Sequence, residues 1–120
     1  MLKFAKILIM LARLVFLVEL GLGIAIASAR GLAYLKLHMS LGFVMAMLLL
    51  LLALVAATKH QIVSVVLGCA FAIALPFIGL KQFPIKFGPA LGAIQYAHVA
   101  VALLSIGIAE MIYARFKRAV

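Results

Sequence analysis

Residues 41–57, LGFVMAMLLLLLALVAA, form an uninterrupted run without a charged or polar side chain. An apolar helix of about 20 residues is long enough to cross the hydrocarbon core of a bilayer. Together with the residues before it, this run predicts a membrane-spanning helix over residues 33–57. Similar apolar stretches occupy most of the remaining chain.

The composition excludes a water-soluble fold. The chain is 70% apolar and only 11% charged, whereas soluble domains are about half apolar and a quarter charged. Its 120 residues leave room for four spans of about 20–25 residues. We predict spans over residues 4–28, 33–57, 62–80 and 88–113. Because the connections are short, we expect neighbouring helices to run antiparallel in one all-α domain, a transmembrane up-down-up-down four-helix bundle over residues 1–120.

The basic residues indicate a membrane orientation. A net charge of +9 would suggest nucleic acid in a soluble protein, but here the Lys and Arg mostly flank the spans. We therefore expect the lipid bilayer as the partner, and no nucleic acid. Seven of the eleven basic residues lie on the side of the termini, and positive charge favours the cytoplasmic side. This predicts a multi-pass protein of a prokaryotic cytoplasmic membrane with both termini in the cytoplasm.

The N-terminal span is expected to be retained. Lys3 and Lys6 before an apolar stretch resemble a signal peptide, but the stretch is long and carries Arg13 and Glu19.

Small residues occur at helical spacing in several spans. Gly23 with Ala27, and Gly68 with Ala72, would let helix backbones approach closely in lipid. They serve either the packing of the bundle or a homodimer interface, and the sequence leaves both open.

Two histidines carry the main functional signal. His38 and His98 lie within the second and fourth spans, 60 positions apart. Helical rise places His38 roughly 9 Å and His98 roughly 15 Å from the start of their spans. Both spans begin at the outer face, so both side chains fall in the outer half. Ionisable side chains inside a membrane segment by default mark a functional site, and these two are predicted to converge across the bundle core from diagonal helices.

A haem fits this pair better than a bare ion, since imidazoles are common axial ligands of haem iron. Gly42 and Ala102, one turn below each histidine, would leave space for the macrocycle. Basic side chains at the outer rim could pair with its propionates, and Tyr34 and Gln95, with Tyr96, could supply hydrogen bonds. The rim residues are Arg30, Lys36, Lys81 and Lys86. The single cysteine excludes a c-type attachment motif, so the haem b would be non-covalent.

The catalytic residue, if there is one, is not identified by the sequence. Glu19 is the candidate. It lies about 22 Å along the first span, again in the outer half. A carboxyl at this depth needs a partner, for which the candidates are a ligand histidine, a cofactor edge, Arg30 or Lys36. Glu110, near Arg13 at the inner end, is interpreted as a member of an ion pair.

The motifs LHMSLG around His38 and QYAHVAVALLSIGIAE around His98 resemble those of small four-helix bacterial membrane b-type cytochromes. These include cytochrome b561-like proteins and single halves of the haem A synthase fold. The resemblance implies haem ligation by His38 and His98. The chain has one intramembrane histidine pair, where b561-like proteins usually have two. It also lacks the glutamate one turn before a ligand histidine that is typical of haem A synthases, because Tyr34 and Ile94 occupy those positions.

The leading hypothesis is therefore a non-enzymatic haem b protein with bis-histidine ligation. It would transfer electrons near the outer face, with a quinone or a redox protein as possible partner. One alternative is a small proton-coupled transporter that uses Glu19. Another is a metal site of Glu19, His38 and His98 that binds zinc or iron.

Overall fold

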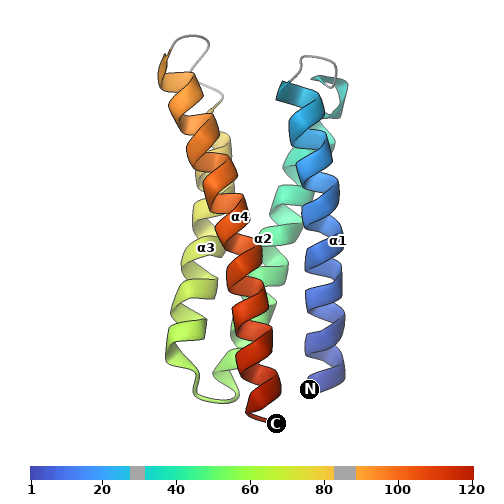
Figure 1. The fold of residues 1–120 in the computed structure, drawn as a ribbon, viewed down its shortest axis with the longest axis vertical. Helices are drawn as coiled ribbons and strands as arrows, with labels where there is room; N and C mark the ends of the chain where they lie inside the picture. The colour runs from blue at the N-terminus through green and yellow to red at the C-terminus, as the bar shows by residue number, and fades with distance from the viewer. Residues whose placement is uncertain (28–31, 83–88) are drawn as a thin grey trace.

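The computed structural model describes residues 1–27, 32–82 and 89–120 of the chain. These residues form four helices, α1 (Leu2–Ala27), α2 (Leu35–Ala57), α3 (Ile62–Leu80) and α4 (Pro89–Arg118), with a 3₁₀ turn η1 (Leu32–Tyr34) before α2. The helices run up, down, up and down, and both termini lie at the same end of the bundle (Figure 1). All four are long and apolar enough to cross a membrane. The predicted all-α four-helix bundle is confirmed.

The helix boundaries follow the predicted spans closely, with one clear difference. α3 covers the predicted residues, but α4 continues five residues beyond the predicted end at residue 113. Its last turn contains Arg115, Lys117 and Arg118. Basic side chains favour the C-terminal end of a helix dipole, so the helix extends past the apolar span. The predicted limits at residues 28 and 88 lie outside the described residues.

The turn between α2 and α3 explains why these helices are antiparallel neighbours. The Thr58 hydroxyl donates to the carbonyl oxygen of Val55 at 2.7 Å, which closes the end of α2. His60 then adopts a φ of 52°, a left-handed conformation that reverses the chain within a few residues. His60 is exposed there, as expected for a loop residue outside the spans.

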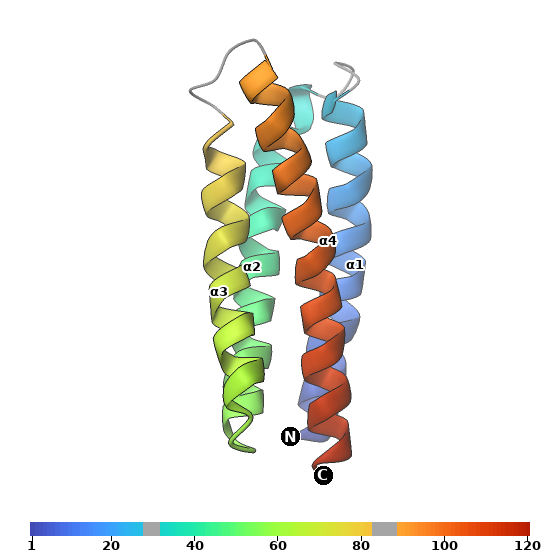
Figure 2. The same ribbon diagram turned by 60° about the vertical axis from the view of Figure 1, so that its left-hand side comes forward.

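The four helices are not arranged as a square. α1 and α3 make no contact within the described parts of the chain, whereas α2 and α4 contact each other directly. α2 and α4 thus lie across the short diagonal, as the two views of the bundle show (Figures 1 and 2). Side chains on their facing surfaces can meet in the middle.

The closely packed core occupies the half of the bundle that holds the termini. On α1 the buried residues end at Ala12, and on α2 they begin at Met45. On the part of α4 whose side chains are described, they begin at Ser105. Outside this half, Leu75 of α3 is an exception. Among the residues whose burial is described, the other half of the bundle is therefore less completely packed.

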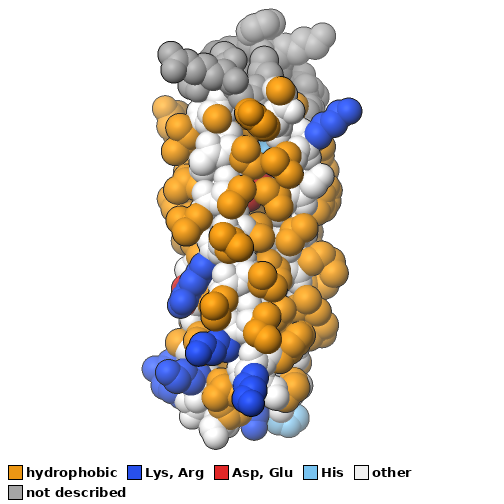
Figure 3. All heavy atoms as spheres, turned by 90° about the vertical axis from the view of Figure 1, so that its right-hand side faces the viewer, with side chains coloured by type: hydrophobic (Ala, Val, Ile, Leu, Met, Phe, Trp, Pro, Cys, Tyr) orange, Lys and Arg blue, Asp and Glu red, His pale blue; other side chains and the backbone are white. Residues whose placement is uncertain are grey.

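The outer surface suits a lipid environment. Apolar side chains cover the middle of the face in Figure 3, and most of its Lys and Arg lie toward the end that holds the termini. This distribution agrees with a multi-pass membrane protein.

Gly68 brings α3 close to its neighbours. A Cβ atom at this position would lie 2.8 Å from the Cβ of Ala53 and 3.1 Å from Cδ1 of Ile112. Gly68 therefore serves packing inside the bundle. Of the two roles that the sequence left open, bundle packing and a homodimer interface, the structure supports the first for this residue.

Gly68→Ala is expected to destabilise the bundle by about 1–3 kcal/mol, because overpacking a close interface forces backbones apart. Gly107→Ala in α4 is the matched control, since a Cβ there has nothing within 4 Å. Alanine is also the better helix former. Thermal unfolding in detergent would measure both variants, and equal melting temperatures would contradict the packing role of Gly68.

Candidate functional site

Glu19 of α1, His38 of α2 and His98 of α4 meet in the less packed half of the bundle. Oε2 of Glu19 lies 2.9 Å from Nδ1 of His38, and these side chains are only 15% and 21% exposed. The imidazole rings of His38 and His98 have centroids 6.1 Å apart and planes inclined at 81°. The sequence placed these three residues at similar depth, and the structure brings them together. We call them the Glu–His–His cluster.

Two glycines contact the cluster at the interface between α1 and α2. Gly23 lies one turn after Glu19 on α1, and Gly42 lies one turn after His38 on α2. A Cβ at Gly42 would lie 3.8 Å from Oε2 of Glu19, and a Cβ at Gly23 would lie 3.8 Å from Cε1 of His38. Since the helices are antiparallel, each polar side chain rests against the glycine of the opposite helix.

Gly79 of α3 lies against His98 in a similar way. Its Cβ would be 3.1 Å from Cε1 and 3.5 Å from Nδ1 of the His98 ring. Nε2 of the ring is 3.8 Å from the same position, so the edge formed by Nδ1, Cε1 and Nε2 faces the backbone of α3. All four helices contribute to the site.

The cluster leaves buried polar atoms without hydrogen bonds. Among the described residues, Oε1 of Glu19 and Nδ1 of both His38 and His98 are buried and have no hydrogen-bond partner. Nδ1 of His38 lies 2.9 Å from Oε2 of Glu19, which is a hydrogen-bond distance. The direction of the N–H bond, however, does not meet the requirement for a hydrogen bond. Unpaired buried polar atoms are costly. Such atoms in a native structure call for a physical explanation, of which a bound ligand is one.

The other predicted site residues have varied positions. Ala102 is half-buried beside the core, and Gly42 faces Glu19. Tyr34, Lys36 and Gln95 are exposed at the surface. Of the remaining rim residues, Lys81 is exposed and its Nζ lies 5.2 Å from the ring centroid of Phe77, while Arg30 and Lys86 lie outside the described residues.

Gly23 and Gly79 were not among the predicted site residues. The signal for Gly23 was present, because Glu19–Gly23 and His38–Gly42 share the same spacing of four. The role of Gly79 depends on how α3 sits against α4, which spacing within one helix does not reveal.

A bare metal site is not supported. Within residues 1–27, 32–82 and 89–120, no group of three or more His, Cys, Asp or Glu side chains is arranged to hold a metal ion. Two imidazoles, by contrast, are a complete protein ligand set for a haem.

Arg13 and Glu110 form a separate ion pair between α1 and α4. Nη2 of Arg13 donates to Oε2 of Glu110 at 2.9 Å, and Nε donates to Oε1. This confirms the predicted pairing of Glu110. The pair lies at the surface, and bidentate geometry is the strong form of such a contact.

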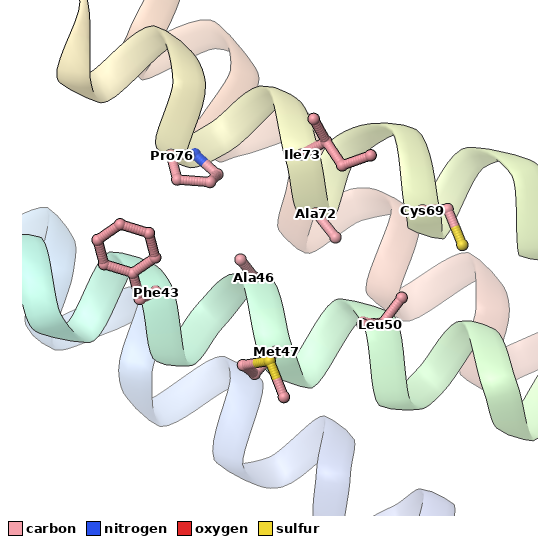
Figure 4. Close-up of a pocket in the computed structure, with 8 residues that line it drawn as sticks. All are labelled: Phe43, Ala46, Met47, Leu50, Cys69, Ala72, Ile73 and Pro76. Carbon is pink, nitrogen blue, oxygen red and sulfur yellow. The ribbon is translucent and has the colours of Figure 1, made fainter.

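An apolar groove of about 380 Å³ runs between α2 and α3 (Figure 4). Phe43 and Pro76 lie at one end of it and Cys69 and Leu50 at the other. Its lining contains neither histidine nor glutamate, so it is separate from the Glu–His–His cluster.

A comparison of the chain with protein-family models, curated proteins and solved structures finds no match. The chemistry of the cluster is therefore the basis for a function.

Proposed function

We propose that this chain binds one b-type haem inside the membrane, with His38 and His98 as axial ligands, and that it transfers electrons. The separation of the two rings carries this proposal. A metal between two imidazole nitrogens at about 2.0 Å from each would place the ring centroids about 6 Å apart. The centroids in the bundle lie 6.1 Å apart, a spacing that is compatible with such a metal. The ligands come from the two helices that face each other across the short diagonal.

The packing supports the same ligand. Side chains fill the half of the bundle near the termini, whereas few of the residues whose burial is described are buried in the half that contains His38 and His98. Glycines at positions 23, 42 and 79 lie against the side chains of the cluster. A flat apolar macrocycle would supply contacts there that the protein does not make for itself.

The ligand set determines the chemistry. A haem b supplies one-electron redox chemistry, and the protein tunes it through its axial ligands and their hydrogen bonds. Because both axial positions would be taken by imidazole, electron transfer is favoured over activation of a substrate. The proposed electron partner is a quinone or a membrane-bound redox protein.

The location follows from the charge distribution. We propose the cytoplasmic membrane of a prokaryote, with both termini in the cytoplasm, because more basic residues lie at the terminal end. The cluster is then nearer the outer face.

The test is an absorption spectrum of the protein purified from haem-replete membranes. The expected result is a Soret band, sharp α and β bands after reduction, and one haem per chain. A folded but colourless preparation would contradict the proposal.

A further inference from the structure

We propose that Glu19 is the positioning residue of His38, and that the two histidines are therefore unequal donors. His38, held by Glu19, is the permanent donor. His98, which has no such partner among the described residues, is the replaceable one. The donor roles rest on the proposed haem function, whereas the positioning role can be tested in the protein without a cofactor.

Glu19 selects one form of the His38 ring. A neutral imidazole carries its proton on one nitrogen and a lone pair on the other. A carboxyl oxygen 2.9 Å from Nδ1 favours the proton on Nδ1, and so leaves the lone pair on Nε2. Because Nδ1 and Nε2 lie on opposite sides of the ring, Nε2 points away from Glu19 and is available to a ligand.

The contact has the distance of a hydrogen bond but not its direction. The outer side-chain torsion of histidine is broad, so a rotation of the ring aligns the N–H with the carboxyl oxygen. Carboxylates that bind the far nitrogen of a ligating histidine commonly set its orientation in this way.

The backbones of α1 and α2 keep the carboxyl of Glu19 and the ring of His38 at the same height in the bundle. The carboxyl of Glu19 packs against Gly42 of α2, and the ring of His38 packs against Gly23 of α1. Both groups therefore lie at the same level of the α1–α2 interface. Larger residues at either position would push one group out of reach of the other.

His98 has a different environment. Its Nδ1 is buried and lacks a hydrogen-bond partner within the described residues, and the adjacent surface is the glycine backbone of α3 at Gly79. The sequence of α3 contains no ionisable side chain apart from Cys69. No carboxyl is therefore available from α3 to orient this ring, and His98 is the histidine that a small neutral donor such as imidazole can replace.

The positioning role is tested by ¹⁵N NMR of the histidines in cofactor-free protein. In wild type, His38 is expected in the Nδ1–H tautomer. Glu19→Gln keeps an oxygen that accepts this hydrogen and should preserve the tautomer, while Glu19→Leu should shift most of the population to Nε2–H. The exposed His60 is an internal control whose signal stays unchanged. An unchanged His38 tautomer in Glu19→Leu would overturn the positioning role.

The donor roles are tested by titration with haemin. Glu19→Leu should weaken binding about 10- to 100-fold, as is typical when the partner of a ligating histidine is removed, and Glu19→Gln should restore most of it. His98→Ala should retain haem at least tenfold more tightly than His38→Ala, and added imidazole should bind to it. Equal losses in the two histidine variants would overturn the inequality. Absence of binding by wild type would refute the haem function itself, and the tautomer result would still decide the role of Glu19.

Discussion

Replacement of both His38 and His98 by alanine is expected to lower haem affinity by more than about 100-fold. Loss of an orienting partner alone costs about 10- to 100-fold, and the double variant removes both donors. No third histidine is near, because His60 lies in the turn at the opposite end of the helices. Haemin titration followed at the Soret band gives the dissociation constant.

His60→Ala is the matched control for this variant. It removes the one histidine outside the cluster and should bind haem as wild type does. The double variant should still fold, because the closely packed core lies in the other half of the bundle. Helical content measured by circular dichroism checks this. A folded double variant with wild-type affinity would eliminate the two histidines as ligands.

Gly79→Leu is expected to displace His98 and remove most of the six-coordinate, low-spin spectrum. A Cβ at Gly79 already lies 3.1 Å from the His98 ring, and a leucine side chain would occupy the position of the ring itself. Haem affinity should fall about tenfold or more, to the level of His98→Ala. Gly79→Ala should have a smaller effect, since its single methyl requires a shift of only a few tenths of an ångström.

Gly21→Leu is the control for the Gly79 series. Gly21 lies on α1 in the same half of the bundle, and a Cβ there meets nothing within 4 Å. This variant should keep the low-spin spectrum. If Gly79→Leu also kept it, the contact between α3 and His98 would have no part in ligation.

The fold was predictable because its signals are local. Continuous apolar runs define the spans, and the four-residue turn at 58–61 dictates an antiparallel pair without knowledge of tertiary contacts. The end of α4 was placed too early because hydropathy marks where a chain leaves the hydrocarbon. It does not mark where the helix stops.

The cluster was predictable in depth but not in detail. Helical rise placed Glu19, His38 and His98 in the same half of the membrane. The cross-helix contacts depend on how the helices are rotated and staggered, which one sequence does not specify. Gly42 was expected to open space beside His38, its neighbour on the same helix. The structure instead places Gly42 against Glu19 of the adjacent helix.

The most direct test of the account is electron paramagnetic resonance of the ferric protein after titration with one equivalent of haemin. Wild type is expected to give a low-spin signal at one haem per chain. His98→Ala should give a high-spin signal, and the His38→Ala/His98→Ala double variant should give no bound haem. A wild-type protein that binds no haem, or a low-spin signal that survives in the double variant, would contradict the account.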